Sequence, residues 1–130
     1  MTPDQVYSKA LQAGKRFPEL EDIILADYLT NQHYSFVYAQ NVIKGRWEKA
    51  EDIILTDVLY SYLYARDIIK GRWVEAEDII MTHPQYAYLY ALYVTKGKLP
   101  DKMHNMMILH AISGGRAALE HVEDYFEFIK

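Results

Sequence analysis

The chain contains no cysteine, only four prolines and six glycines, and no long uninterrupted apolar run among its 130 residues. Without cysteine it has no disulfide, no zinc–thiolate site and no thiol nucleophile, so its stability must come from packing. Neither a run of roughly 18 apolar residues, as in a membrane span, nor the basic and apolar start of a signal peptide is found. We therefore expect a cytoplasmic protein without a membrane partner.

Charge of one sign is not in excess either. The 14 lysines and arginines face 18 aspartates and glutamates, which gives a net charge of −4. A nucleic acid or an anionic membrane would need a local basic patch on such a chain. The 51% hydrophobic content suffices for a core, and the length fits one domain over residues 1–130.

The dominant feature of the sequence is internal repetition. Residues 60–73 recur with few changes at residues 34–47 and 86–99, at an offset of 26 residues, and the acidic block 50–55 recurs at 76–81. A period of this length is typical of stacked supersecondary units. We predict an all-α fold, a right- or left-handed α-solenoid of 26-residue helix-turn-helix repeats.

The predicted organisation has capping helices around three repeats. We expect an N-terminal capping helix at 2–14, repeats at about 16–45, 46–71 and 72–97, and a divergent C-terminal cap at 98–130. The loop 28–33 of the first repeat is four residues longer than its later equivalents, and the sequence assigns it no role.

Each repeat is predicted to contain two short helices. The second one opens near Thr30, Asp57 or His83 and closes at a Lys-Gly pair, where we expect the glycine to adopt the left-handed conformation. In the middle copy the spacing i, i+3, i+4, i+7 places Ser61, Tyr64, Ala65 and Ile68 on a core face. In the final helix five residues are expected to cover the last repeat: Ala118, Val122, Tyr125, Phe126 and Ile129.

Basic residues recur at the turn after each second helix, and they have two interpretations. Stacked repeats would align them along one edge, which could follow phosphates. The favoured interpretation is local: each lysine offsets a helix dipole, Arg46 pairs with Glu51, and Arg72 pairs with Glu77.

Tyrosine is unusually frequent, with 12 copies. The tyrosines at the helix starts are expected to be the most exposed, whereas Tyr38, Tyr64 and Tyr90 should pack beside the core with a satisfied hydroxyl. Trp47 and Trp73 should wedge neighbouring repeats together or serve as binding hot spots. The candidate partner-binding residues are Tyr34, Tyr60, Tyr86, Trp47, Trp73, Arg46, Arg72, Lys98, Leu63 and Arg66.

Catalytic and metal-binding patterns are weak. None of the five histidines has the i, i+4 spacing of a helical zinc pair, and the acidic pairs repeat instead of forming one asymmetric site. No nucleophile motif or phosphate loop is found. We expect no metal, no cofactor and no enzymatic activity.

The Tyr-Ala-Tyr-Leu-Tyr-Ala, Lys-Gly-Arg-Trp and Glu-Ala-Glu-Asp-Ile-Ile blocks resemble repeats of small proteins from bacteriophages and other large DNA viruses. The resemblance covers about residues 16–100, although the family's Pro-Glu pair after the aromatic residue is complete only at Pro18-Glu19. It implies a phage origin and the host cytoplasm, and no particular activity.

Two functions fit these observations. The first is a protein–protein interaction module, monomeric or homodimeric, that binds and inhibits or modulates a host protein such as a defence or CRISPR component. The alternative is nucleic-acid or nucleotide binding along the basic edge, with tyrosine and tryptophan stacking.

Overall fold

The computed structural model describes every residue from Met1 to Lys130 and consists of helices and turns, without a strand. The all-α prediction is therefore confirmed. The contacts between residues divide the chain into two compact units, residues 1–69 and residues 70–130. Each is described in turn below.

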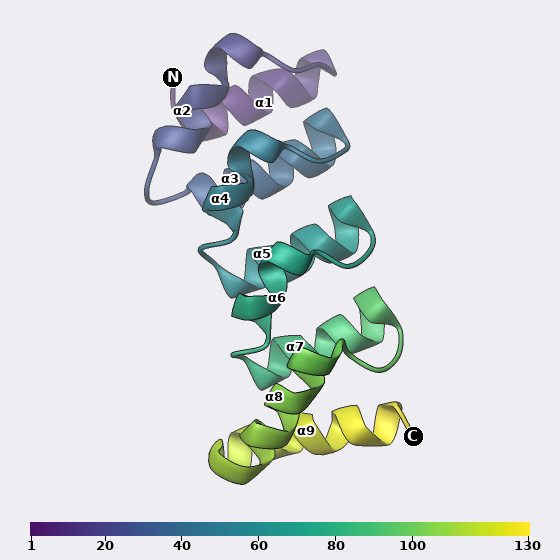
Figure 1. Cartoon of the computed structure of the whole chain (residues 1–130). Helices are drawn as coiled ribbons and strands as arrows, with labels where there is room; N and C mark the ends of the chain where they lie inside the picture. Colours follow the sequence, from purple (N-terminus) through teal and green to yellow (C-terminus); the bar gives the residue numbers. More distant parts are fainter. The chain divides into compact units, whose positions relative to one another are not determined.

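The first unit pairs short helices with longer ones. In chain order its elements are α1 (Pro3–Ala13), the 3₁₀ helix Pro18–Leu20, α2 (Glu21–Ala26), α3 (Asn31–Tyr38) with the π-helix Ala39–Ile43, α4 (Glu48–Ile54), and α5 (Val58–Tyr64) with the π-helix Ala65–Ile69. Helix α3 packs against both α1 and α5, in the purple to teal part of Figure 1. The three longer helices thus form one layer of this unit.

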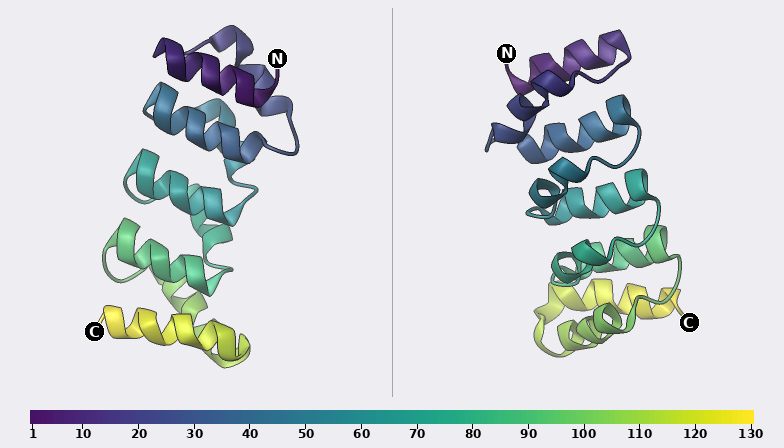
Figure 2. Two further views of the ribbon diagram at one scale, coloured as in Figure 1. Left: turned by 180° about the vertical axis from the view of Figure 1, so that it is seen from behind. Right: turned by 45° about the horizontal axis from the view of Figure 1, so that its top comes forward.

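The second unit contains four α-helices. They are α6 (Val74–Ile80), α7 (Pro84–Tyr90) with the π-helix Ala91–Thr95, α8 (Asp101–Ser113) and α9 (Gly115–Phe128). Helix α9 packs against both α7 and α8, as the green and yellow helices of Figure 2 show. The last helix therefore covers α7, and Val122 and Tyr125 are its buried residues.

Side chains and proline stabilise several helix starts. Thr2 and Gln5 form a reciprocal capping box at α1, and Asp57 accepts a hydrogen bond from the Tyr60 amide at α5. Pro84 occupies the first turn of α7, where its missing amide hydrogen costs nothing. The predicted starts near Thr30, Asp57 and His83 are confirmed, since α3, α5 and α7 begin at the residue that follows each.

The helix ends correct one prediction. We expected the glycine of each Lys-Gly pair to be left-handed, but the lysines adopt that conformation, with φ of 61° at Lys44, 61° at Lys70 and 54° at Lys96. Each follows a π-helical turn, and the Lys44 amide donates to the Ala39 carbonyl at 2.8 Å. The chain therefore reverses one residue earlier than expected, at the lysine that follows the π turn instead of at the glycine.

Each π-helix starts at an alanine with no exposed surface, namely Ala39, Ala65 or Ala91. The predicted core face is confirmed at Ser61, Tyr64 and Ala65, whereas Ile68 is half-buried. Small residues at these positions let the neighbouring helix approach closely. None of the helices combines the length and apolar composition that a membrane crossing requires.

Candidate interaction surfaces

An arginine, a glutamate and a tyrosine form the same hydrogen-bonded cluster three times. In the middle copy, Nε and Nη2 of Arg46 donate to the two oxygens of Glu51 at 2.9 and 2.8 Å. The Tyr64 hydroxyl donates to Glu51 at 2.7 Å and accepts from the backbone amide of Trp47 at 2.8 Å. The three copies of this Arg–Glu–Tyr cluster are Arg16–Glu21–Tyr38, Arg46–Glu51–Tyr64 and Arg72–Glu77–Tyr90.

The Arg–Glu–Tyr cluster changes the pKa of its glutamate and of its tyrosine. Burial raises the pKa of Glu51, but the hydrogen bonds from Arg46 and Tyr64 and the arginine charge lower it more, so the net pKa lies below its ordinary value. Burial, together with the hydrogen bond to Glu21, raises the pKa of Tyr38 to about 12. The glutamates are therefore anions at neutral pH and hold each turn against the tyrosine of the following helix.

The predicted pairs Arg46–Glu51 and Arg72–Glu77 are confirmed, with 2.8 Å between Nη2 and Oε1 in each. About half of each arginine side chain remains exposed, but its charge is matched by the adjacent carboxylate. The arginines of the turns therefore serve a structural role and leave little free positive charge there.

The two tryptophans are core residues. Trp47 is 3% exposed and Trp73 is 2% exposed, and the Trp47 ring contacts Tyr38 at a centroid distance of 5.0 Å. A partner could not reach either ring in this conformation.

The tyrosines at the helix starts are half-buried instead of exposed. Tyr34 contacts the Tyr7 ring at 6.1 Å, and its hydroxyl donates to Asp4. Tyr60 lies 6.0 Å from the His33 ring and its hydroxyl is 3.0 Å from Nδ1 of that histidine. In the first unit, these rings join neighbouring helices of the layer. Tyr86, in the second unit, is also half-buried and has its ring 6.3 Å from that of His83.

The remaining predicted residues differ in availability. Leu63 is half-buried, and Arg66 pairs with Asp67 while its guanidinium lies 5.4 Å from the centre of the Tyr62 ring. Lys98 is exposed, and its charge is one cause of the lowered pKa of His104, after burial. The predicted residues therefore range from buried tryptophans to the exposed Lys98.

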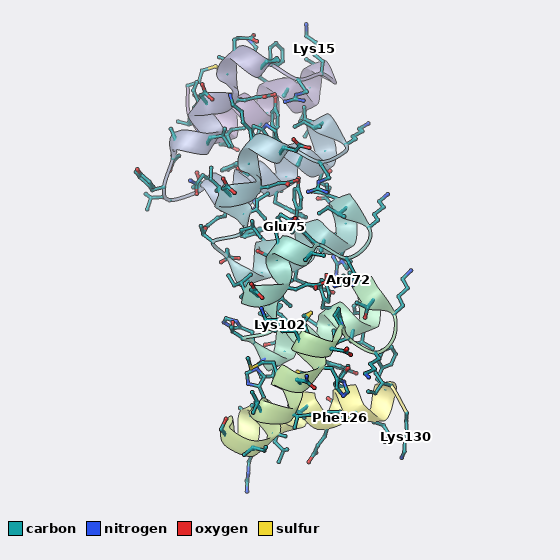
Figure 3. All side chains as sticks on the ribbon, in the orientation of Figure 1. Lys15, Arg72, Glu75, Lys102, Phe126 and Lys130 are labelled. Carbon is teal, nitrogen blue, oxygen red and sulfur yellow. The ribbon has the colours of Figure 1, made fainter.

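Lysines supply the free positive charge of the turns. Lys44, Lys70 and Lys96 are exposed and make no ion pair, and Lys15 lies 5.2 Å from the centre of the Phe17 ring. Figure 3 shows the Lys15 side chain extending away from the ribbon. No three His, Asp or Glu side chains stand close enough together to hold a metal ion.

The most exposed apolar residues lie in the longer loop of the first repeat. Tyr28 is 94% exposed and Leu29 is 93% exposed. Sequence reasoning identified the insertion but assigned it no role. The exposure of these two residues could have been predicted, because large apolar residues in an inserted turn have no matching place in the core of the repeat.

Hydrogen bonds connect the backbone and side chains of this loop. The Asp27 carboxylate accepts from the Leu29 amide at 3.0 Å, and the Asp27 carbonyl accepts from the amides of Thr30 and Asn31. The Asn31 side chain donates back to the Leu25 carbonyl at 3.2 Å. Two large apolar side chains are thus presented to solvent on an ordered turn.

A second exposed apolar stripe lies on α8, where Ile108, Leu109 and Ile112 follow the i, i+1, i+4 spacing of one helix face. Comparison of the chain with protein-family models, with curated proteins and with solved structures returns no match.

Proposed function

We propose that the chain is an α-solenoid of 26-residue helix-turn-helix repeats with capping helices, and that it acts as a protein–protein interaction module. The repeated cluster supports the architecture, because the same hydrogen bonds occur in the first unit at Arg46 and in the second at Arg72. Small-angle X-ray scattering tests it, since a solenoid gives an elongated particle and a collapsed pair of units gives a rounder one.

The ordered loop with Tyr28 and Leu29 carries the functional proposal. Adjacent, almost fully exposed apolar side chains form a small apolar patch, exposed apolar patches can mark interaction sites, and tyrosine is enriched among binding hot spots. The hydrogen bonds of Asp27 and Asn31 already fix the turn, so binding would cost little further conformational entropy. A protein partner with an apolar pocket fits this feature.

The resemblance to phage repeats sets the class of partner. In this proposal the partner is a host protein, a defence or CRISPR component included, whose activity the bound chain inhibits or modulates. The proposed contact on the first unit is the Tyr28–Leu29 loop.

The test compares the wild-type chain with a Tyr28→Ser, Leu29→Ser double variant in affinity capture from bacterial lysate, followed by binding measurements with the purified partner. We expect a loss of about 2 kcal/mol or more, roughly thirtyfold in Kd. The melting temperature should not change, because neither side chain packs against the protein.

Val74→Ser is the matched control, since Val74 is an exposed apolar residue outside the loop. It should bind as the wild type does. Equal affinity of the double variant and the wild type for every captured partner would contradict the assignment of this loop.

The alternative function is nucleic-acid binding, favoured by the exposed, unpaired lysines of the turns. Pairing of the arginines with glutamates weakens it, because it leaves fewer cations to displace counterions from phosphates. A steep loss of affinity with salt and the loss of captured material on nuclease treatment would favour this alternative.

A further inference from the structure

The second unit contains a surface pocket of about 330 Å³ between the start of α7 and the start of α9. Its walls include His83, Gln85 and Tyr86 from the α7 end and Ala117, Ala118 and His121 from α9. Figure 2 shows these two helices side by side, in agreement with their packing contacts. The volume lies near the lower limit of ligand pockets, about 300 to 1,000 Å³.

Hydrogen bonding of the core tyrosines defines which residue of α9 matches the helix-start tyrosines. Tyr64 accepts from the Trp47 amide and Tyr90 from the Trp73 amide, and Tyr125 accepts from the Leu99 amide at 3.0 Å in the same way. Tyr60 and Tyr86 precede their core tyrosines by four residues, and the residue four before Tyr125 is His121. The last helix therefore has an imidazole where the others have a phenol.

The first unit shows what the phenol does at this place. The Tyr60 ring of α5 lies against the rings of His33 and Phe36 on α3, with centroid distances of 6.0 and 5.9 Å. His33 precedes Tyr34 by one residue, and the matching residue of α7 is Gln85, which lines the pocket. The pocket thus occupies the region into which a tyrosine at position 121 would extend.

Two further features define the chemistry of an occupant. Neither lysine, arginine, aspartate nor glutamate lines the pocket, so a charged ligand would find no opposite charge there. The alanines and Pro84 supply apolar wall, while His83, Gln85 and His121 offer hydrogen-bonding groups. An uncharged planar ring with one polar tip matches this lining.

We propose that the α7–α9 pocket binds the phenol ring of a tyrosine on the protein partner, in the place that a tyrosine of the chain itself fills in the first unit. This inference rests on the proposed function, since it names a contact that the partner makes. The pocket and the Tyr28–Leu29 loop are then separate contacts.

The experiment is a titration of the ¹⁵N-labelled full chain with N-acetyl-tyrosinamide, p-cresol and N-acetyl-leucinamide, followed by amide chemical shifts. The tyrosine amide should give saturable shifts confined to residues 82–86 and 114–121, with a Kd on the order of 1 mM. The leucine amide should give none. Absence of saturable shifts with the tyrosine amide, or equal shifts with the leucine amide, would overturn the proposal. Binding of p-cresol alone would overturn its peptide source.

Variants of the pocket test whether the amide chemical-shift changes come from binding there. His121→Tyr fills it with the ring of the other repeats, and we expect binding to weaken about tenfold or more with the melting temperature retained or raised. Ala118→Leu fills the pocket from the preceding turn of α9 and serves if His121→Tyr folds poorly. Leu119→Tyr adds the same ring to α9 outside the pocket and should bind as the wild type does. Wild-type affinity in both filled variants would overturn the proposal.

No partner is needed for this titration. Its failure therefore contradicts the pocket alone, whereas failure of the capture experiment with the loop variant contradicts the proposed function.

Discussion

The Tyr125 hydroxyl lies 2.7 Å from Nδ1 of His104, whereas in the three Arg–Glu–Tyr clusters the tyrosine hydroxyl donates to a glutamate. Each glutamate comes four residues after the aromatic residue of its turn. In the C-terminal copy Leu99 takes the place of that aromatic residue, and the residue four after it is the buried Met103. His104, the next residue, supplies the polar partner instead. The C-terminal copy therefore replaces a carboxylate with an imidazole.

A pH dependence follows from this exchange. Burial and the charge of Lys98 lower the pKa of His104 below 6.5, against the opposing effect of Asp101. Its contribution to stability is thus complete above pH 6.5 and is lost as the pH falls through the folded-state pKa. The urea concentration at the unfolding midpoint should decrease as the pH is lowered from 7.5 to 5, and His104→Gln should reduce this decrease. An equal decrease in the variant and the wild type would contradict the prediction.

Removal of an arginine from its cluster should cost more than removal of the neighbouring lysine. Arg72→Ala leaves the buried Glu77 carboxylate without its bidentate partner, and we expect a loss of about 1 to 2 kcal/mol because half of the arginine is exposed. Lys70→Ala removes an unpaired side chain and should change stability by less than about 0.5 kcal/mol. Chemical denaturation measures both, and equal effects would mean that the pair is not stabilising.

The left-handed lysines predict a stabilising substitution. Lys70 has a φ of 61°, which strains a residue that carries a Cβ, so Lys70→Gly should stabilise the protein by about 1 kcal/mol. Gly71→Ala should be tolerated, because a Cβ there meets no atom within 4 Å and the residue is not left-handed. A destabilised Lys70→Gly in thermal denaturation would contradict this assignment.

Gly114 should not tolerate a side chain. A Cβ at this position would lie 2.6 Å from the His110 carbonyl oxygen and 2.7 Å from the Ala118 Cβ, so the turn between α8 and α9 would have to open. We expect Gly114→Ala to cost about 1 to 3 kcal/mol, in contrast to Gly71→Ala. Comparison of the two melting temperatures tests this, and equal values would show that the α8–α9 turn adapts freely.

The core alanine of the middle repeat leaves no room for a larger side chain. Ala65 is fully buried at the start of its π-helix, so Ala65→Leu should overpack the first unit and cost on the order of 1 to 3 kcal/mol. Alanine at an exposed site such as Ala13 should accept leucine with little change. An unchanged unfolding free energy for Ala65→Leu would contradict its core assignment.

Some features were predictable because they depend on neighbours in the sequence. Capping by Thr2 and Asp57 acts within one helical turn, and the Arg72–Glu77 pair spans five residues around a single turn. Repetition strengthened these inferences, because the same residue types recurred at the same spacing. The left-handed lysines were not predicted, because each helix ends in a π-helical turn and reverses one residue before the glycine. The residue pattern contains no sign of that turn.

Exposure could not be predicted in the same way. Tyr60 and Tyr28 are the same residue type, but Tyr60 lies against His33 and Phe36 while Tyr28 projects from an ordered loop. Burial excludes Trp47 from direct contact with a partner in this conformation, whereas Tyr28 is accessible to one.

The sequence by itself determined the helical class, the 26-residue period, the helix starts and the arginine–glutamate pairing, since each depends on interactions within about one repeat. Only the tertiary structure decided which aromatic rings are buried, which residues end the helices in the left-handed conformation, and where a pocket forms. Those properties depend on the side chains of a neighbouring helix, and a smaller ring at His121 has its effect only against the surface of α7.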